Sequence, residues 1–164
     1  MLFTGQSEVS IDAKQRLAIP AKHRNLWNPE RDGDAWVCVP WSGGLRLYTE
    51  ARFEALAGMI EESLTPGEDE AQLDADLFSL AERLEIDAQG RIVLPKPHLR
   101  LAGLGREVAG PDGVQKFETS PVVVIGARNR LEVRERDAWL AGQHERLARR
   151  AALIERIEAR KGGQ

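Results

Sequence analysis

The sequence has 164 residues, 42% of them hydrophobic and 30% charged, with a formal net charge of −3. This length and composition fit one domain or two small halves sharing a core, and they exclude a disordered chain. The apolar runs are too short to span a membrane, and the N-terminus lacks the basic and apolar regions of a signal peptide. With one cysteine no intrachain disulfide can form, so we predict a soluble, cytoplasmic protein with no membrane partner.

The first predicted element is a β-hairpin near the N-terminus. Residues 8–11 and 16–19 alternate apolar and polar side chains, which is the pattern of half-buried strands. The turn between them begins at Asp12, whose carboxylate can accept bonds from the backbone that follows it. The turn ends at Gln15, for which we predict a left-handed conformation. That conformation costs a residue with a side chain on the order of 1 kcal/mol.

A short helix and a second hairpin are predicted next. Pro20 favours an extended residue before it and opens the helix "AKHRNLW". The second hairpin joins "VCVPW" to "LRLYT" through the turn Ser42–Gly44. Cys38 lies within its first strand, where a plain core thiol is the predicted role and a reactive thiol the rarer alternative.

Two amphipathic helices are predicted around the connecting segment 54–83. The first helix covers residues 50–64 and ends before the Pro-Gly pair at 66–67. The second helix covers residues 70–84 and has four leucines at helical spacing along one stripe. These are Leu73, Leu77, Leu80 and Leu84.

The segment 84–138 repeats the plan of the segment 5–53, which indicates an internal duplication. The phrase "DAKQRLAIP" returns as "DAQGRIVLP", and the strands and helix start that follow it also match. The matched pairs include Asp12 with Asp87, Gln15 with Gly90, Arg16 with Arg91, Leu17 with Ile92, Pro20 with Pro95, Leu45 with Leu131 and Leu47 with Val133. We therefore predict that Asp12, Asp87 and Gly90 shape two equivalent turns, in which Gly90 accepts the left-handed conformation freely.

Two segments lie outside this duplication. The second copy carries an extra loop, Gly110–Pro121, which the pattern does not place. A helix is predicted from Arg136 onward, so that the last segment, 139–164, is a C-terminal helix and tail. Its apolar stripe is narrow and rich in arginine, which predicts surface packing or contact between subunits.

Basic side chains gather around the repeated phrase. If the apolar residues of each strand point inward, Arg16 and Arg91 point outward beside their turns. Further cations lie close to them in the sequence, namely Lys14, Lys22, Arg24 and Arg100. Charges on a solvated strand edge are the commoner explanation of such a pattern, and a basic face for a phosphate backbone is the alternative.

No constellation of catalytic residues is apparent, and we predict neither an enzyme nor a cofactor. The three histidines are not spaced as metal ligands with one another or with Cys38. His23 and His98 fall on the short helices, where surface or phosphate-facing roles are predicted. Asp12 and Asp87 are explained as turn residues better than as a catalytic pair.

The paired Asp-x-x-x-Arg phrases, each followed by a proline, resemble the MraZ family from Met1 to about Trp139. The resemblance implies a bacterial transcriptional regulator at the head of the division and cell-wall gene cluster. It implies an α+β fold in which two AbrB/SpoVT-type halves form a swapped-hairpin β-barrel with peripheral helices. It also implies closure of subunits into a homo-oligomeric ring, such as an octamer or dodecamer.

For function, the resemblance implies a repressor that binds direct repeats of double-stranded promoter DNA at the nucleoid. Arg16 and Arg91 would be its main DNA contacts, joined by Arg24 and Arg100 after the prolines. This chain departs from the family in Gln15, where a glycine is usual, and in the loop at 110–121. The alternative function is a non-enzymatic protein-interaction module, such as an antitoxin-like protein of the same fold.

Overall fold

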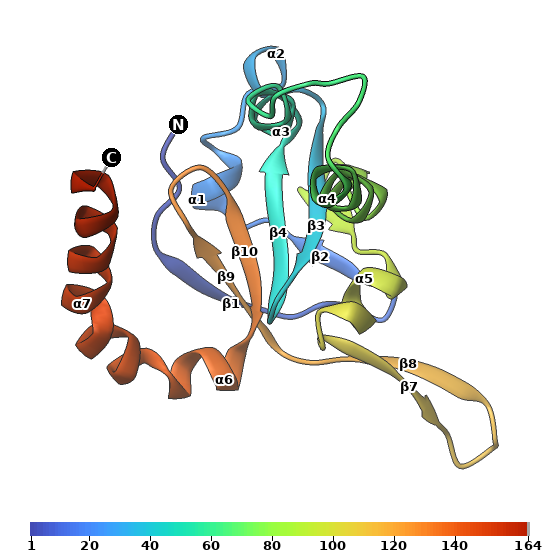
Figure 1. The fold of residues 1–164 in the computed structure, drawn as a ribbon. Helices are drawn as coiled ribbons and strands as arrows, with labels where there is room; N and C mark the ends of the chain where they lie inside the picture. The colour runs from blue at the N-terminus through green and yellow to red at the C-terminus, as the bar shows by residue number, and fades with distance from the viewer. Residues whose placement is uncertain (164) are drawn as a thin grey trace.

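The computed structural model describes residues 1–163 and shows an α+β protein built on antiparallel sheets (Figure 1). The largest sheet has six strands in the order β1-β9-β10-β4-β3-β5. Its strands are β1 (Gln6–Val9), β3 (Ala35–Trp41), β4 (Gly44–Thr49), β5 (Glu82–Glu85), β9 (Val122–Gly126) and β10 (Leu131–Glu135). Two smaller sheets pair β2 (Arg16–Ala18) with β6 (Arg91–Val93), and β7 (Gly105–Ala109) with β8 (Gln115–Thr119).

The order of the six strands follows the duplication of the sequence. The hairpins β3–β4 and β9–β10 meet at the centre, where Leu45 lies opposite Val133 and Leu47 opposite Leu131. Each outer strand comes from the other half of the chain, because β1 pairs with β9 and β5 pairs with β3. The two halves therefore complete each other's part of the sheet.

Two predictions about strand pairing are wrong. Strands β1 and β2 do not form a hairpin: β1 joins the large sheet, β2 pairs with β6, and only an isolated bridge links Ile11 to Leu17. The β-structure is also not a closed barrel, because β1 and β5 lie at opposite edges of an open sheet. Each edge strand has four residues, after which the chain continues into the β2–β6 pair.

The core lies between the large sheet, the β2–β6 pair and the short helices. It contains Trp36, Leu45, Leu47 and Leu131 from the sheet and Leu17, Ile19, Ile92 and Leu94 from the smaller pair. Cys38 is fully buried in β3, and burial raises the pKa of its thiol to about 12. The prediction of a core thiol is therefore confirmed.

Seven helices surround the sheets in the part of the chain that the structure describes. They are α1 (Ala21–Arg24), α2 (Pro29–Asp32), α3 (Glu50–Ala57), α4 (Glu68–Ser79), α5 (Lys96–Leu101), α6 (Arg136–Ala141) and α7 (Gln143–Gly162). The predicted helix over 50–64 stops early, with Gly58 as its C-cap. The helix predicted over 70–84 begins at Glu68 and ends at Ser79, and Leu84 is instead a buried residue of β5.

The C-terminal helix and the extra loop extend away from the body of the protein (Figure 1). The predicted helix from Arg136 is present but interrupted at Gly142, and its last predicted residue lies outside the described part of the chain. The loop that the sequence did not place contributes to the β7–β8 hairpin. Phe117 and Leu99 both lie against Gly105 at its base, and the Thr119 hydroxyl donates to the Ile11 carbonyl at 3.2 Å.

Candidate nucleic-acid interface

The two Asp-x-x-x-Arg turns have the same internal hydrogen bonds. One carboxylate oxygen of Asp12 accepts from the backbone N–H groups of Lys14 and Arg16, both at 2.9 Å. Asp87 accepts the equivalent two bonds at the same distance. The pKa of each carboxyl is lowered, first by the backbone N–H of its arginine and also by the guanidinium. The prediction that Asp12 and Asp87 shape the turns is consistent with this geometry.

The last residue of each turn is left-handed, as the sequence predicted. The φ angle is 59° at Gln15 and 75° at Gly90. The Gln15 side chain lies back over its own turn and donates to the Ala13 carbonyl at 2.9 Å. Gln15 therefore has the same left-handed conformation as Gly90 in the equivalent turn, at the cost of backbone strain.

Strands β2 and β6 form a two-stranded ribbon that joins the two turns. Leu17 lies opposite Ile92, and both are fully buried. The neighbouring pairs, Arg16 with Val93 and Ala18 with Arg91, therefore lie on the other face. Here we call residues 15–19 and 90–94 the arginine ribbon. A backbone hydrogen bond between the two halves of the chain lies at each end of the ribbon. One runs from the Ile19 N–H to the Gly90 carbonyl and the other from the Leu94 N–H to the Gln15 carbonyl.

Each ribbon arginine is held by the aspartate of its own turn. The Arg16 Nε donates to Asp12 at 2.6 Å, and the Arg91 Nε donates to Asp87 at 2.8 Å. About 30% of each arginine side chain is exposed. The terminal nitrogens of Arg16 have no hydrogen-bond partner within residues 1–163, whereas one nitrogen of Arg91 donates to the Gln89 side chain at 3.1 Å. The geometry leaves both terminal nitrogens of Arg16 and one terminal nitrogen of Arg91 available to a ligand.

The sequence did not predict these ion pairs, although its spacing contained the signal. An aspartate four residues before an arginine, across a tight turn, brings the carboxylate under the guanidinium. The same spacing occurs in both copies. The aspartates therefore both shape the turns and orient the arginines.

The other predicted cations divide into two groups. Lys14 is exposed on the first turn, and the Lys22 Nζ lies 3.4 Å from the Gln6 carbonyl. Arg24 crosses to the turn of the other half, where it packs on Gly90 and donates to the Gln89 carbonyl at 3.1 Å. These three cations lie in or beside the segments that build the ribbon.

Arg100 is placed differently from Arg24. Its guanidinium pairs with Glu107 on β7 at 3.2 Å and lies 5.6 Å from the centre of the Phe117 ring. The structure therefore directs Arg100 toward the β7–β8 hairpin. A DNA contact by Arg100 stays a prediction from the resemblance alone.

The prediction of surface or phosphate-facing roles for two histidines is wrong. His23 is 1% exposed, with its ring edge-on to Phe3, and burial lowers its pKa. His98 is 6% exposed, and its Nε2 lies 2.7 Å from the Leu80 carbonyl. The short helices place both rings in the protein interior, so neither histidine faces a ligand.

The described residues contain no group of three or more His, Cys, Asp or Glu side chains that could hold a metal ion. Within residues 1–163, no helix is both long enough and apolar enough to cross a membrane.

These features define a class of protein: a duplicated α+β fold whose halves present two anchored arginines on one β-ribbon. The family profile described as "MraZ protein, putative antitoxin-like" matches residues 2–75 and 77–158. The chain therefore belongs to the MraZ family, and the resemblance seen in the sequence is confirmed.

Three relatives of similar length carry the name "Transcriptional regulator MraZ". The protein from Thioalkalivibrio sulfidiphilus is 26% identical over 144 residues, which cover 88% of this chain and 87% of the relative. The protein from Shewanella oneidensis is 27% identical over 140 residues, covering 85% and 83%. The protein from Methylococcus capsulatus is 27% identical over 138 residues, covering 84% and 82%.

Proposed function

We propose that this protein is a DNA-binding transcriptional regulator that acts as a homo-oligomer and carries out no catalysis. The observation that carries the proposal is the arginine ribbon, which places Arg16 and Arg91 on one face with each anchored through Nε. The names of the relatives support a regulator of transcription.

The shape of the ribbon suits the major groove of B-DNA. That groove is about 12 Å wide and admits a two-stranded β-ribbon. Anchoring through Nε leaves the terminal nitrogens of Arg16 to make a bidentate bond to the O6 and N7 of guanine, the commonest specific contact of arginine. Lys14 and Lys22 would contact phosphates and fix the register of the ribbon on the duplex.

The negative net charge of the chain is compatible with this role because the acids are concentrated elsewhere. Residues 61–76 hold seven of the 26 acidic side chains and no lysine or arginine. Beside the ribbon, by contrast, Asp12 and Asp87 are each balanced by an arginine. The excess positive charge there comes from Lys14, Lys22 and Arg24. A local basic face is what a phosphate backbone senses.

The finer proposal is a repressor at the nucleoid, bound to direct repeats in the promoter of its own division and cell-wall gene cluster. Pairing of β1 with β9 and β5 with β3 supports a fold of the swapped-hairpin type. A ring such as an octamer or dodecamer would repeat the ribbon at fixed intervals, so that weak contacts add through effective concentration.

A salt titration tests the proposal. The purified full chain is titrated onto a labelled duplex from immediately upstream of its gene and onto a shuffled duplex of equal composition, between roughly 50 and 200 mM salt. We expect tighter binding to the upstream duplex and an affinity that falls steeply with salt. Equal affinity for both duplexes, or no binding, contradicts the proposal.

The second candidate is an antitoxin-like module that binds another protein. It is favoured by the exposed apolar side chains of α4 and α7, among them Leu73, Leu147 and Ile157. Such an interface would bury apolar area and respond weakly to salt, so the same titration separates the two candidates.

A further inference from the structure

Helix α7 has an apolar stripe that is exposed along most of its length in residues 1–163. None of its 20 residues is buried, and in Figure 1 it stands apart from the sheet. Leu147, Leu153, Ile154 and Ile157 are between 46% and 58% exposed. The helix is about 30 Å long, and an amphipathic helix gains most of its stability from packing its apolar face. We therefore expect this apolar face to pack against another surface.

The same helix is basic. It carries six lysine and arginine residues against three glutamates, so its net charge is +3. Arg150 lies within the apolar stripe, and Arg156 flanks it. A partner for this surface must therefore be both apolar and acidic.

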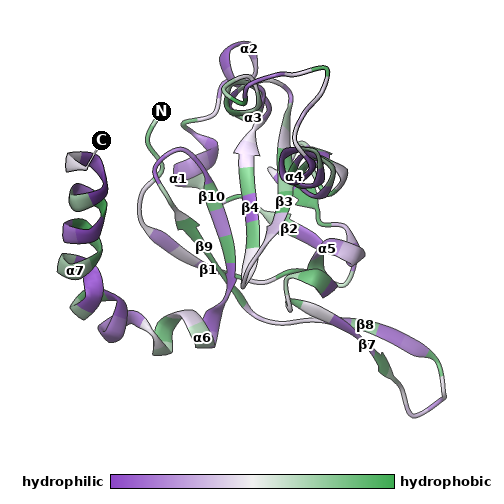
Figure 2. Cartoon of the chain, viewed as in Figure 1, coloured by the Kyte–Doolittle hydropathy of each residue, from purple (hydrophilic) through white to green (hydrophobic). Residues whose placement is uncertain are grey.

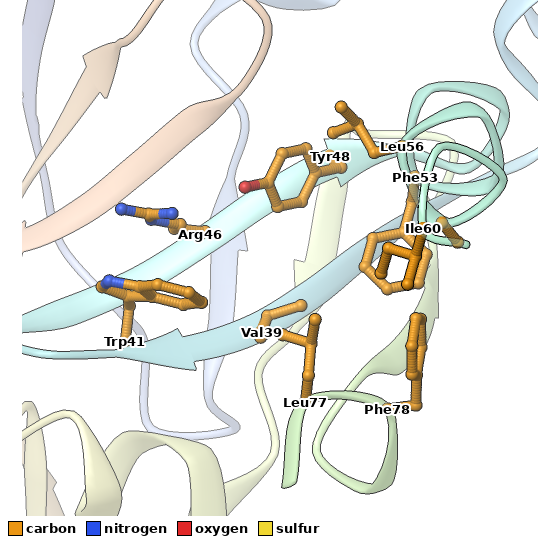
Figure 3. Close-up of a pocket in the computed structure, with 10 residues that line it drawn as sticks. Val39, Trp41, Arg46, Tyr48, Phe53, Leu56, Ile60, Leu77 and Phe78 are labelled. Carbon is orange, nitrogen blue, oxygen red and sulfur yellow. The ribbon is translucent and has the colours of Figure 1, made fainter. Parts of the chain in front are cut away.

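The protein itself has a surface of this kind at the other end of the sheet. There, α3 and α4 enclose a cavity of about 130 Å³ against β3 and β4 (Figure 3). Its walls are the side chains of Val39, Phe53, Leu56, Ile60, Leu77 and Phe78. An engineered cavity of about 150 Å³ accommodates benzene, so this one has room for an aliphatic side chain such as leucine or isoleucine.

One end of the cavity is formed by Arg46, which shares the Glu132 carboxylate with Arg130 and Arg134. The Arg46 guanidinium stacks over the Trp41 ring at 3.9 Å, and its Nε lies 3.3 Å from Glu132. The rest of the lining is predominantly apolar. The cavity therefore suits an apolar side chain along most of its length.

The surface beside this cavity is acidic and also apolar, because an adjoining hollow is lined by Glu61, Glu62, Glu70 and Asp74. The segment 61–76 contributes seven carboxylates without a cation. Met59, Leu64 and Leu73 are each at least 62% exposed in the same region. We call α3, α4 and the segment between them the acidic surface. Its charge and its exposed apolar side chains are the complement of those on α7.

We propose that α7 of one copy docks on the acidic surface of a second copy, with an aliphatic side chain of the helix in the cavity. Helix α7 lies on the opposite side of the sheet from α4 (Figure 2), so it does not reach the acidic surface of its own chain. The contact joins two different surfaces head to tail. Such an interface generates a ring when the rotation that relates successive subunits adds up to a full turn. The inference rests on the proposed self-assembly and is independent of DNA binding.

The test is a complementary charge reversal, measured without DNA. One variant carries Arg150→Glu and Arg156→Glu on α7. The other carries Glu61→Lys and Asp74→Lys on the acidic surface, outside the first turn of α4, so the acids at that helix N-terminus remain. Each variant alone opposes like charges, whereas an equimolar mixture restores an attractive pair at every contact.

We expect sedimentation to show wild-type oligomers, a mass near the 18.2 kDa protomer for each variant alone, and recovery of the oligomer on mixing. Circular dichroism checks that both variants remain folded. Retention of the wild-type mass by either variant, or failure of two folded variants to recover on mixing, overturns the proposal. A monomeric wild-type protein overturns it as well.

A matched pair on α7 tests the apolar stripe separately. Ile154→Asp places a charge within the stripe, and Ala152→Asp places the same charge about 200° around the helix, on the opposite face. Only Ile154→Asp is expected to dissociate the oligomer. If reversal of the α7 arginines weakens DNA binding while the mass stays that of the wild type, α7 is a DNA contact and the proposal is wrong.

Discussion

Exchanging the residues at the ends of the two turns should shift stability in opposite directions. Gln15→Gly removes the left-handed strain of a residue with a side chain, worth roughly 1–2 kcal/mol. The greater conformational freedom of glycine in the unfolded chain offsets about 0.4–1 kcal/mol of this gain. The exposed hydrogen bond from the Gln15 side chain to the Ala13 carbonyl is also lost. The expected gain is about 0.5–1 kcal/mol, or roughly 1–4 °C in Tm for a chain of this length.

The reverse change, Gly90→Gln, should be clearly destabilising. Gly90 has a φ of 75°, and a Cβ there would collide with the Arg24 guanidinium that packs on it. The strain and the displaced Arg24 bond together cost about 2 kcal/mol, which lowers the Tm by roughly 4–8 °C.

Thermal melting at one fixed protein concentration measures both variants, because assembly makes the Tm depend on concentration. A neutral Gly90→Gln, or a Gln15→Gly variant that melts below the wild type, would refute the assignment of equivalent strained turns.

Three further outcomes are expected. Ile92→Ala, at the buried centre of the ribbon, should cost about 2–5 kcal/mol in urea unfolding, whereas Val93→Ala on its exposed face should stay within about 0.5 kcal/mol. Burial lowers the pKa of His23, so near and below pH 6.5 the unfolded chain binds more protons than the folded protein. The free energy of unfolding of the wild type should therefore fall between pH 7.5 and 5.5, and it should fall less steeply in His23→Leu. The Cys38 thiol, with its pKa raised to about 12, should resist a thiol reagent at pH 8 until the protein is unfolded.

Local features of the two turns were predictable from the sequence because they depend on neighbouring residues. An aspartate that opens a turn and a left-handed residue that closes it follow from the chemistry of four consecutive positions. The outward direction of Arg16 and Arg91 follows from the alternation around them. Both features appear in the structure, and the sequence also predicted the buried thiol of Cys38 correctly.

Features that depend on distant contacts were not predictable in this way. A three-residue strand such as β2 fits any antiparallel partner, so its pairing with β6 is decided by the meeting of the two halves. Leu84 continues a helical spacing from Leu77, yet its burial beside Trp36 makes it a strand residue. His23 is polar on a short helix, and only the packing of Phe3 against it places it in the core.

The hairpin within the extra loop has a local signal in the sequence. Pro111, Asp112 and Gly113 form a turn sequence, and alternating residues flank it. In the structure this turn separates β7 from β8, and Gly113 is left-handed. The segment boundaries predicted at residues 53, 83 and 138 stay predictions.

A double substitution, Arg16→Ala with Arg91→Ala, tests whether the arginine ribbon binds DNA. The measurement is a titration of the upstream duplex, accompanied by thermal melting and by sedimentation. Arg83→Ala is the matched control, because Arg83 is also an exposed arginine paired with a carboxylate but lies on β5. We predict normal folding and assembly, with a loss of about 1–3 kcal/mol of binding free energy per base-reading arginine and little change in the control. Unchanged DNA affinity in a folded, assembled double variant would contradict the claim.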